Sequence, residues 1–128
     1  MRILIVDDEK DVREVLRDFF EMEGFEVFEA VEGKSAVEIA REHPLDVVLT
    51  DLRMPGTDGF SVLKEIRHIR PEAAVLIFSG YASPADASEA LKLGCDGYVN
   101  KPVRLDELRH VIRQGLIRRR GEGQHLGS

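Results

Sequence analysis

The sequence has little cysteine and no long apolar run, and both absences narrow the class of protein. Its 128 residues include a single cysteine, Cys95, so the chain forms no internal disulfide, which suits a reducing cytoplasm. No stretch approaches the roughly 20 apolar residues of a membrane span. The apolar start of MRILIVDD is too short for a signal-peptide core. We therefore expect a soluble, cytoplasmic protein without a membrane partner.

The sequence also lacks the charge of a general nucleic-acid binder and the glycine-rich loops of nucleotide-binding proteins. Its formal net charge is −6, whereas binding to phosphates needs a basic face. Neither G-x-x-x-x-G-K-[ST] nor G-x-G-x-x-G occurs. The four histidines show no metal-ligand spacing. We expect no direct contact between this chain and nucleic acid.

The charges that are present are unevenly distributed. Residues 1–32 hold 4 basic and 11 acidic side chains, whereas residues 101–120 hold 7 basic and 2 acidic side chains. Solvated helix faces are the simpler interpretation, and a basic docking surface near the C-terminus is the alternative.

Short apolar runs alternate with helical patterns along the whole chain. Helical spacing is clear, for example, in DVREVLRDFFEMEG. This alternation predicts an α/β fold, a doubly wound five-stranded parallel sheet flanked by five helices. The second run contains Glu26 and Glu29 and is expected at an edge of the sheet, whereas runs one, three and four are nearly all apolar, as central strands are. The runs are ILIV (3–6), FEVFEA (25–30), VVLT (47–50), AVLIFS (74–79) and GYVN (97–100).

The helical patterns make specific predictions about helix ends and faces. Ser83 is expected to cap the fourth helix, with Pro84 in its first turn and Gly94 as its stop. Asp58 is interpreted as a helix cap and not as a ligand. The last helix begins near Arg104, and the chain divides into a single domain over 1–117 and a flexible tail or linker stub over 118–128. The buried stripe of the first helix is predicted to hold Val12, Val15, Leu16, Phe19 and Met22.

Polar residues follow the apolar runs, where an open parallel sheet binds ligands beyond the carboxyl ends of its strands. The first run ends in Asp7-Asp8-Glu9 and the third in Asp51. Three neighbouring carboxylates repel one another, and a hard cation with oxygen ligands, Mg²⁺, relieves that repulsion. The remaining runs end in Ser79-Gly80 and in Asn100-Lys101-Pro102.

The residue types at these strand ends suit phosphoryl chemistry. A magnesium ion, an amine, a hydroxyl and free loop amides together match the needs of three phosphoryl oxygens. A carboxylate in their midst can act as a nucleophile and form an aspartyl phosphate.

Four motifs now identify a family that the chain resembles: ILIVDDE, VVLTDLRMPGTDGF, AVLIFSGY and GYVNKP, in this order and spacing. From Arg2 to about Leu116, the chain is similar to the receiver domain of two-component response regulators. The resemblance implies a flavodoxin-like sheet of strand order 2-1-3-4-5. It also implies Mg²⁺-dependent phosphorylation by a histidine kinase or phosphotransfer protein. This modification would switch the surface of the fourth helix, fifth strand and fifth helix.

The resemblance further implies partners and residue roles. Partners would be a downstream effector protein or a tethered output domain, and a homodimer could form on phosphorylation. The domain would be a substrate and switch, not an enzyme. Arg53 and Tyr81 occupy positions that tune the phosphate lifetime. The roles are Asp51 as phosphoacceptor, Asp8 as direct Mg²⁺ ligand, Asp7 as a ligand mainly through water, the backbone carbonyl of Arg53 as a further ligand, Ser79 and Lys101 as phosphoryl contacts, Tyr98 as the aromatic that turns inward on activation, and Pro102 (after a typically cis peptide) and Gly80 as supporting residues.

Two alternative functions share either the nucleophilic aspartate or the architecture. A phosphatase of the haloacid dehalogenase type would share the nucleophilic aspartate, but it typically needs a second aspartate two residues later, where this chain has Arg53. A flavin or nucleotide carrier would share the architecture but lacks its phosphate-binding loop here. Taken singly, Lys101 could be an ordinary surface lysine and Tyr98 a core residue.

Overall fold

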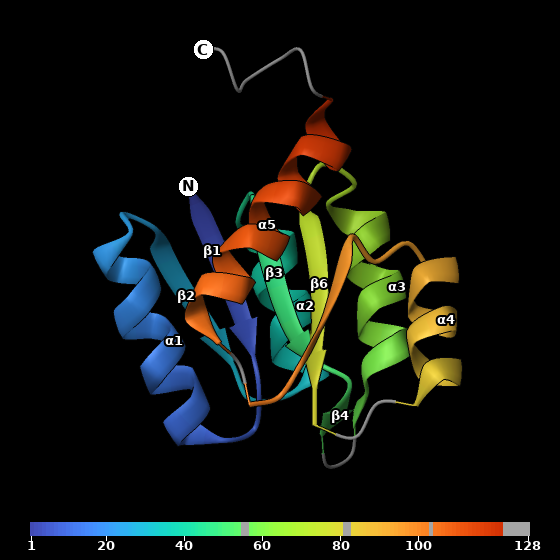
Figure 1. The fold of residues 1–128 in the computed structure, drawn as a ribbon. Coiled ribbons are helices and arrows are strands. Elements are labelled where there is room, and N and C mark those ends of the chain that lie inside the picture. The colour runs from blue at the N-terminus through green and yellow to red at the C-terminus, as the bar shows by residue number, and fades with distance from the viewer. Residues whose placement is uncertain (55–56, 81–82, 103, 122–128) are drawn as a thin grey trace.

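The computed structural model describes residues 1–54, 57–80, 83–102 and 104–121. In this part of the chain, five parallel strands form one sheet with helices on both faces (Figure 1). The elements in chain order are β1 (Arg2–Val6), α1 (Lys10–Met22), β2 (Glu26–Ala30), α2 (Gly33–Glu42), β3 (Val47–Asp51), β4 (Arg53–Met54), β5 (Thr57–Asp58), α3 (Gly59–Ile69), β6 (Ala74–Ser79), α4 (Pro84–Lys92), β7 (Gly97–Asn100) and α5 (Leu105–Arg120).

The strand order confirms the topology expected from the sequence. The sheet runs β2-β1-β3-β6-β7, and every neighbouring pair is parallel. Each of the five apolar runs forms one of these strands, and β2 lies at an edge. The chain order reverses at β1, which lies between β2 and β3. This switch point places the carboxyl ends of β1 and β3 beside each other, and ligands of such sheets bind there.

Two short strands were not predicted from the sequence. β4 and β5 form an antiparallel pair in which Arg53 lies opposite Asp58 and Met54 opposite Thr57. Strands of two residues are too short to show a period of two, so the sequence indicated only a turn. The pair leads directly into α3, where the Asp58 side chain accepts a hydrogen bond of 3.0 Å from the backbone N–H of Phe60. The prediction that Asp58 caps a helix is confirmed.

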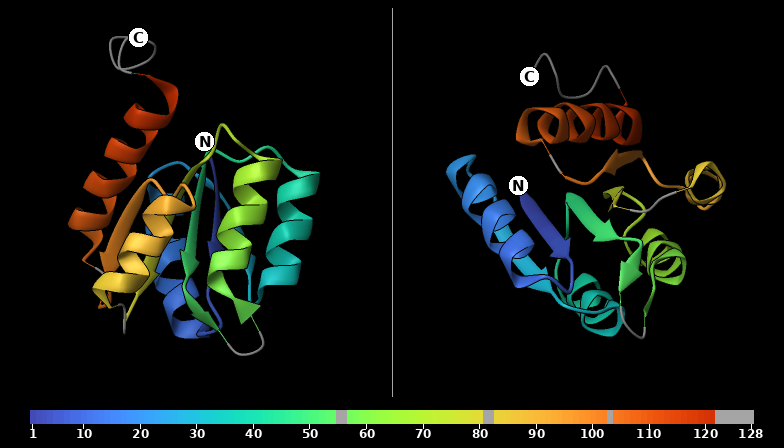
Figure 2. Two further views of the ribbon diagram at one scale, coloured as in Figure 1. Left: turned by 90° about the vertical axis from the view of Figure 1, so that its right-hand side faces the viewer. Right: turned by 60° about the horizontal axis from the view of Figure 1, so that its bottom comes forward.

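The sheet has an apolar core on each face because strand side chains alternate between the faces. Ile3 and Ile5 of β1 pack with residues of α1 and α5 such as Leu16 and Ile112. Leu4 and Val6 of the same strand belong to the cluster on the other face. That cluster also contains residues from α2, α3 and α4, and the two views of Figure 2 show these helices opposite α1 and α5. Double coverage explains why β1, β3 and β6 are so uniformly apolar.

The predicted stripe of α1 is wrong at two positions. Leu16 is buried, but Val15 is 57% exposed and Met22 is 87% exposed. The buried side chain that the stripe omitted is Phe20, whose ring meets that of Phe25 edge to face with the ring centroids 5.3 Å apart. A helix at the border of a sheet buries only a narrow arc, so apolar residues well off the centre of that arc remain in solvent.

The predicted cap and stop of α4 are both observed, and α5 is longer than predicted. Ser83 caps α4 and forms a reciprocal capping box with Asp86. Gly94 follows the helix with a φ of 96°, as its predicted role as a stop requires.

The helix α5 continues to Arg120, three residues into the segment expected as a tail, and residues 122–128 lie outside the described residues. The division into 1–117 and 118–128 therefore stays a prediction.

The basic end of α5 is bound to acidic groups of the domain. Arg119 donates to Asp96 Oδ1 at 2.8 Å, and Arg120 donates to Asp46 Oδ1. Arg118 donates to the backbone carbonyl of Asp96 at 2.9 Å. Three of the basic residues near the C-terminus thus make internal contacts. Within the part of the chain that the structure covers, none of the helices has the length and apolar character of a bilayer span.

Candidate functional site

The polar residues at the strand ends meet at one edge of the sheet, the lower edge in Figure 1. Asp7 directly follows β1, and Asp51 is the last residue of the neighbouring strand β3. Carboxylate oxygens of Asp7, Asp8 and Asp51 all lie within 4.8 Å of one another. The three acids that the sequence analysis selected are therefore brought together by the fold, although up to 44 positions separate them in the sequence.

Lys101 connects two of these acids. Its Nζ donates to Oδ2 of Asp7 and to Oδ2 of Asp51, each at 2.8 Å, and it lies 3.5 Å from Oε1 of Glu9. The same ammonium group lies 4.9 Å from the ring centroid of Phe78. Lys101 is only 16% exposed, so its charge is largely withdrawn from water and directed at the carboxylates.

Burial and pairing change the proton affinities in this cluster. Burial raises the pKa of the Asp7 carboxyl above its ordinary value, and the hydrogen bond from Lys101 opposes that rise. Burial lowers the pKa of Lys101, but its hydrogen bonds to Asp51 and Asp7 outweigh this effect, and the pKa lies well above its ordinary value. The two carboxylates that Lys101 contacts therefore favour its charged form.

Asp7 and Asp8 are adjacent in sequence but have different environments. Asp7 is completely buried, and its Oδ1 accepts a hydrogen bond of 2.8 Å from the backbone N–H of Glu9. Its own N–H donates to the carbonyl of Ala30 at 3.1 Å. Asp8 is exposed. The pair thus offers one fixed internal carboxylate and one that faces solvent.

The other predicted site residues lie in or next to β6 and β7. Ser79 ends β6 and is 2% exposed, and its carbonyl accepts a hydrogen bond of 2.9 Å from the N–H of Lys101. The peptide between Lys101 and Pro102 is cis, as the resemblance implied. Tyr98 lies opposite Ile77 in the sheet and packs, partly buried, against the cluster that α2, α3 and α4 cover.

Three further predictions concern residues around Asp51 and the end of β6. Among the described residues, a Cβ at Gly80 would meet the Cβ of Lys101 at 3.8 Å, an ordinary contact distance. Arg53 begins β4 two residues after Asp51, and the role of its carbonyl as a metal ligand stays a prediction. Tyr81 lies outside the described residues.

Two residues at this site had no role predicted from the sequence. Glu9 approaches Lys101. Arg13 was not considered, yet its Nη1 donates to the backbone carbonyl of Asp7 at 2.9 Å. A long side chain that reaches back to a loop carbonyl follows no motif. The one indication in the sequence is that Arg13 lies one helical turn after the acidic residues, close enough for its side chain to reach their backbone.

The cluster fits a magnesium ion by the chemistry of its donors. Asp7, Asp8 and Asp51 supply carboxylate oxygens only, and no histidine or cysteine belongs to the group. Hard divalent cations prefer such ligands, and Mg²⁺ needs few of them because it retains bound water.

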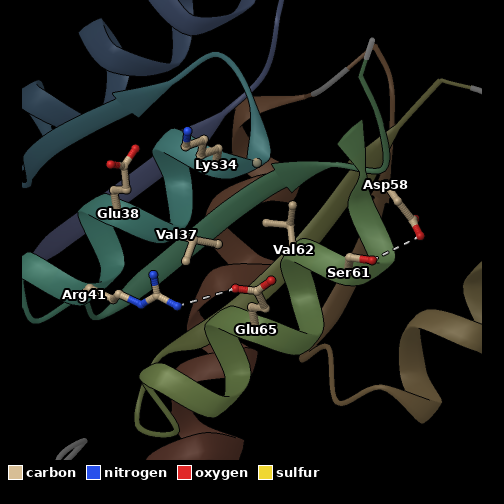
Figure 3. A pocket seen from close by; sticks show the side chains of 9 residues that line it. Lys34, Val37, Glu38, Arg41, Asp58, Ser61, Val62 and Glu65 are labelled. Atoms are coloured by element: carbon tan, nitrogen blue, oxygen red, sulfur yellow. Dashed lines mark hydrogen bonds and ion pairs between the residues drawn. The ribbon is translucent and has the colours of Figure 1, made fainter. Parts of the chain in front are cut away.

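A separate hollow of about 470 Å³ lies between α2 and α3 (Figure 3). Its lining carries both signs of charge, and Arg41 Nη2 lies 3.9 Å from Glu65 Oε2 across it. Lys34 and Glu38 add one further charge of each sign. With Asp58, the lining holds two basic and three acidic side chains, whereas three carboxylates converge in the acidic cluster, which remains the candidate site.

Comparison with known proteins gives one consistent result. A family model described as "Response regulator receiver domain" matches residues 3–113. The regulatory protein AtoC of Escherichia coli (strain K12) is 43% identical over 115 residues, which are 90% of this chain and 25% of that protein. Sporulation initiation phosphotransferase F of Bacillus subtilis (strain 168) is 34% identical over 115 residues, which are 90% of this chain and 93% of that protein.

A solved structure adds a chemical detail. It is a response regulator protein from Burkholderia pseudomallei with a phosphorylated aspartic acid, a calcium ion and citrate. It matches this fold with a TM-score of 0.86 at 25% identity, over 96% of this chain and 72% of that one. This chain thus spans about a quarter of the first relative and nearly all of the second.

Proposed function

Because this chain belongs to the response regulator receiver domain family, we propose that it is a phosphorylation switch whose phosphoacceptor is Asp51. The observation that supports this assignment most directly is the position of Asp51. It ends a central strand, its carboxylate bonds to Lys101, and two further aspartates lie within reach of one shared cation. The phosphorylated aspartate in the solved relative is consistent with the same chemistry.

The proposed reaction is a transfer from phosphohistidine to a carboxylate. An Oδ of Asp51 attacks the phosphorus, the new O–P bond forms as the N–P bond breaks, and the released imidazole takes up a proton. Mg²⁺ bound by Asp7, Asp8, Asp51 and the Arg53 carbonyl would neutralise charge on the phosphoryl oxygens. Lys101 already touches Asp51 and needs only a small displacement to pair with one of these oxygens.

Phosphorylation would change the structure through charge. The phosphoryl group carries about two negative charges at neutral pH in place of the single charge of the Asp51 carboxylate, and its oxygens attract hydroxyl and ammonium donors. Ser79 and Lys101, at the ends of β6 and β7, are the donors next to Asp51. Movement of Ser79 would let Tyr98 turn inward and alter the surface of α4, β7 and α5. Gly80 and Pro102 flank these two donors and support the loops that move.

The domain would be a substrate and switch, with a histidine kinase or phosphotransfer protein as donor. The Bacillus subtilis relative is named a phosphotransferase. A receiver domain that acts in this way would also transfer its phosphoryl group to a further protein. The Escherichia coli relative is about four times as long as the matched segment. One candidate recipient of the signal is therefore an output domain tethered after the receiver domain (1–117). The alternatives are a separate effector protein and a homodimer. We expect this chain to be cytoplasmic, where a histidine kinase or phosphotransfer protein would phosphorylate it.

Intact-mass measurement tests this proposal. Treatment with acetyl phosphate and Mg²⁺ should add about 80 Da, the mass of one phosphoryl group. Chelation of the metal and Asp51→Asn should each abolish the gain. Asp58→Asn is the matched control, because Asp58 is a nearby aspartate that only caps a helix. A gain that persists in Asp51→Asn, or no gain with any phosphodonor, would refute Asp51 as the acceptor.

A further inference from the structure

Arg13 is the residue outside the predicted set that has the closest connection to the metal-binding cluster. It lies in the first turn of α1, where its N–H donates to the carbonyl of Glu9 at 3.1 Å. Its side chain is only 14% exposed. The guanidinium group donates in two directions, through Nη1 to the carbonyl of Asp7 at 2.9 Å and through Nε to Oε1 of Glu29 at 3.1 Å. Arg13 therefore connects the acidic loop (residues 7–9) to the edge strand β2.

The bond to Asp7 fixes a particular part of the backbone. A peptide unit is planar, so the carbonyl of Asp7 and the N–H of Asp8 turn together. On the other side of this residue, the N–H of Asp7 is bound to Ala30, and both side-chain oxygens are bound, one to Glu9 and one to Lys101. Arg13 thus supplies the contact that sets the plane from which the exposed side chain of Asp8 departs.

Glu29 holds Arg13 in the orientation that this contact needs. Glu29 pairs with Ile5 in the sheet, so its backbone position is set by β1. Its two carboxylate oxygens accept from Arg13 and from Arg17 respectively. A guanidinium group is a planar fork with fixed donor directions, so a bond through Nε constrains where Nη1 points.

We infer that Arg13 is a positioning residue that orients the Asp7–Asp8 peptide so that both carboxylates can bind one magnesium ion. This inference rests on the proposed function of the site. Arg13 does not touch the ion or the phosphoryl group itself. It acts through the acidic loop, and contacts of this kind change metal affinity about 10- to 100-fold when they are removed.

The test is calorimetric titration of Mg²⁺ into the metal-free protein, without a phosphodonor. We expect Arg13→Gln to raise the Kd for Mg²⁺ about tenfold. Arg17→Gln is the matched control: among the residues described, Arg17 bonds to the same Glu29 and to Glu21 but not to the acidic loop. We expect that variant to stay within about twofold of the parent protein. Thermal unfolding in chelator reports the effect of each change on stability alone.

Two additional measurements keep the inference testable. In metal-free protein, Arg13→Gln should shift the backbone amide NMR signals of Asp8 and Glu9, and Arg17→Gln should leave them in place. If Arg13→Gln does not fold, Arg13→Lys keeps the charge and can make only one of the two bonds, and we expect it to weaken Mg²⁺ binding to a smaller extent.

The results separate this inference from the proposed function. If the parent protein binds Mg²⁺ and is phosphorylated while both glutamine variants have the same Kd, the positioning role is wrong and the switch stands. If the parent protein neither binds Mg²⁺ nor gains a phosphoryl group, both ideas are wrong.

Discussion

The Nζ atom of Lys101 lies 2.8 Å from Oδ2 of Asp51, although 50 positions separate the two residues in the sequence. The same atom bonds to Oδ2 of the completely buried Asp7. One ammonium group therefore balances two carboxylates that would otherwise repel each other. An incoming cation or phosphoryl group has to share these oxygens with Lys101, so the lysine links stability to ligand binding.

Replacement of Lys101 tests this link. In chelator, Lys101→Met should lower the free energy of unfolding by about 1–3 kcal/mol, because a buried carboxylate loses its charged donor. Added Mg²⁺ should recover part of this loss, since the ion supplies positive charge to the same oxygens. Urea unfolding in both buffers measures the effect. Lys92→Met, at an exposed lysine of α4, is the control, and a loss for Lys101→Met that Mg²⁺ leaves unchanged would contradict the prediction.

Gly59 should not tolerate a side chain. A Cβ at this position would lie 2.5 Å from the carbonyl oxygen and 2.6 Å from the Cα of Leu52, both backbone atoms that cannot rotate away. We expect Gly59→Ala to cost about 1–3 kcal/mol, despite the better helix propensity of alanine. Among the described residues, the Cβ that Gly80→Ala adds meets the Cβ of Lys101 at ordinary contact distance, and stability should change by less than about 0.5 kcal/mol. Equal stabilities of the two variants in urea would show that the loop before α3 can adjust.

Asp96 should anchor the end of α5. It is 2% exposed, and its carboxylate accepts from Arg67 at 2.9 Å, from Arg119 at 2.8 Å and from the N–H of Val75 at 2.9 Å. Asp96→Ala leaves two arginines without their counter-charge and should cost about 3 kcal/mol. Amide hydrogen exchange in the last turn of α5 should become faster. Asp106→Ala, at an exposed aspartate of the same helix, should change neither quantity.

Asp46 should contribute stability that depends on pH. Burial raises the pKa of its carboxyl, but hydrogen bonds from the Arg2 N–H and from Arg120 outweigh burial and hold the pKa below its ordinary value of 3.8. A carboxyl with a depressed folded-state pKa stabilises the protein above its unfolded pKa, and this stability is lost as the pH falls through the folded pKa. We expect Asp46→Asn to cost about 1 kcal/mol at pH 7, and this cost should shrink as the pH falls below 3.8 and through the lower folded-state pKa.

Urea unfolding of both proteins between about pH 2.5 and 7 measures this difference. A difference that stays constant across the range would mean that the charge of Asp46 is not the cause.

The sequence by itself determined the five strands of the main sheet and the edge of that sheet that carries the site. Five apolar runs specify the strands because a strand covered on both faces must be apolar along its length. The polar residues after those runs, among them Asp7, Asp51 and Lys101, can then meet only at the carboxyl edge. The cap at Ser83 and the stop at Gly94 were also predictable, because each depends on the local backbone alone.

Only the tertiary structure decided how these residues differ from one another. Asp7 and Asp8 are both acidic neighbours in sequence, yet burial of one and exposure of the other follow from packing between β1, β2 and β7. The exposure of Val15 and Met22 and the contact of Arg13 with a loop carbonyl likewise depend on where α1 meets the sheet. Periodicity and local capping act within a few residues, whereas burial and side-chain pairing join residues far apart in sequence and exist only once the sheet has formed.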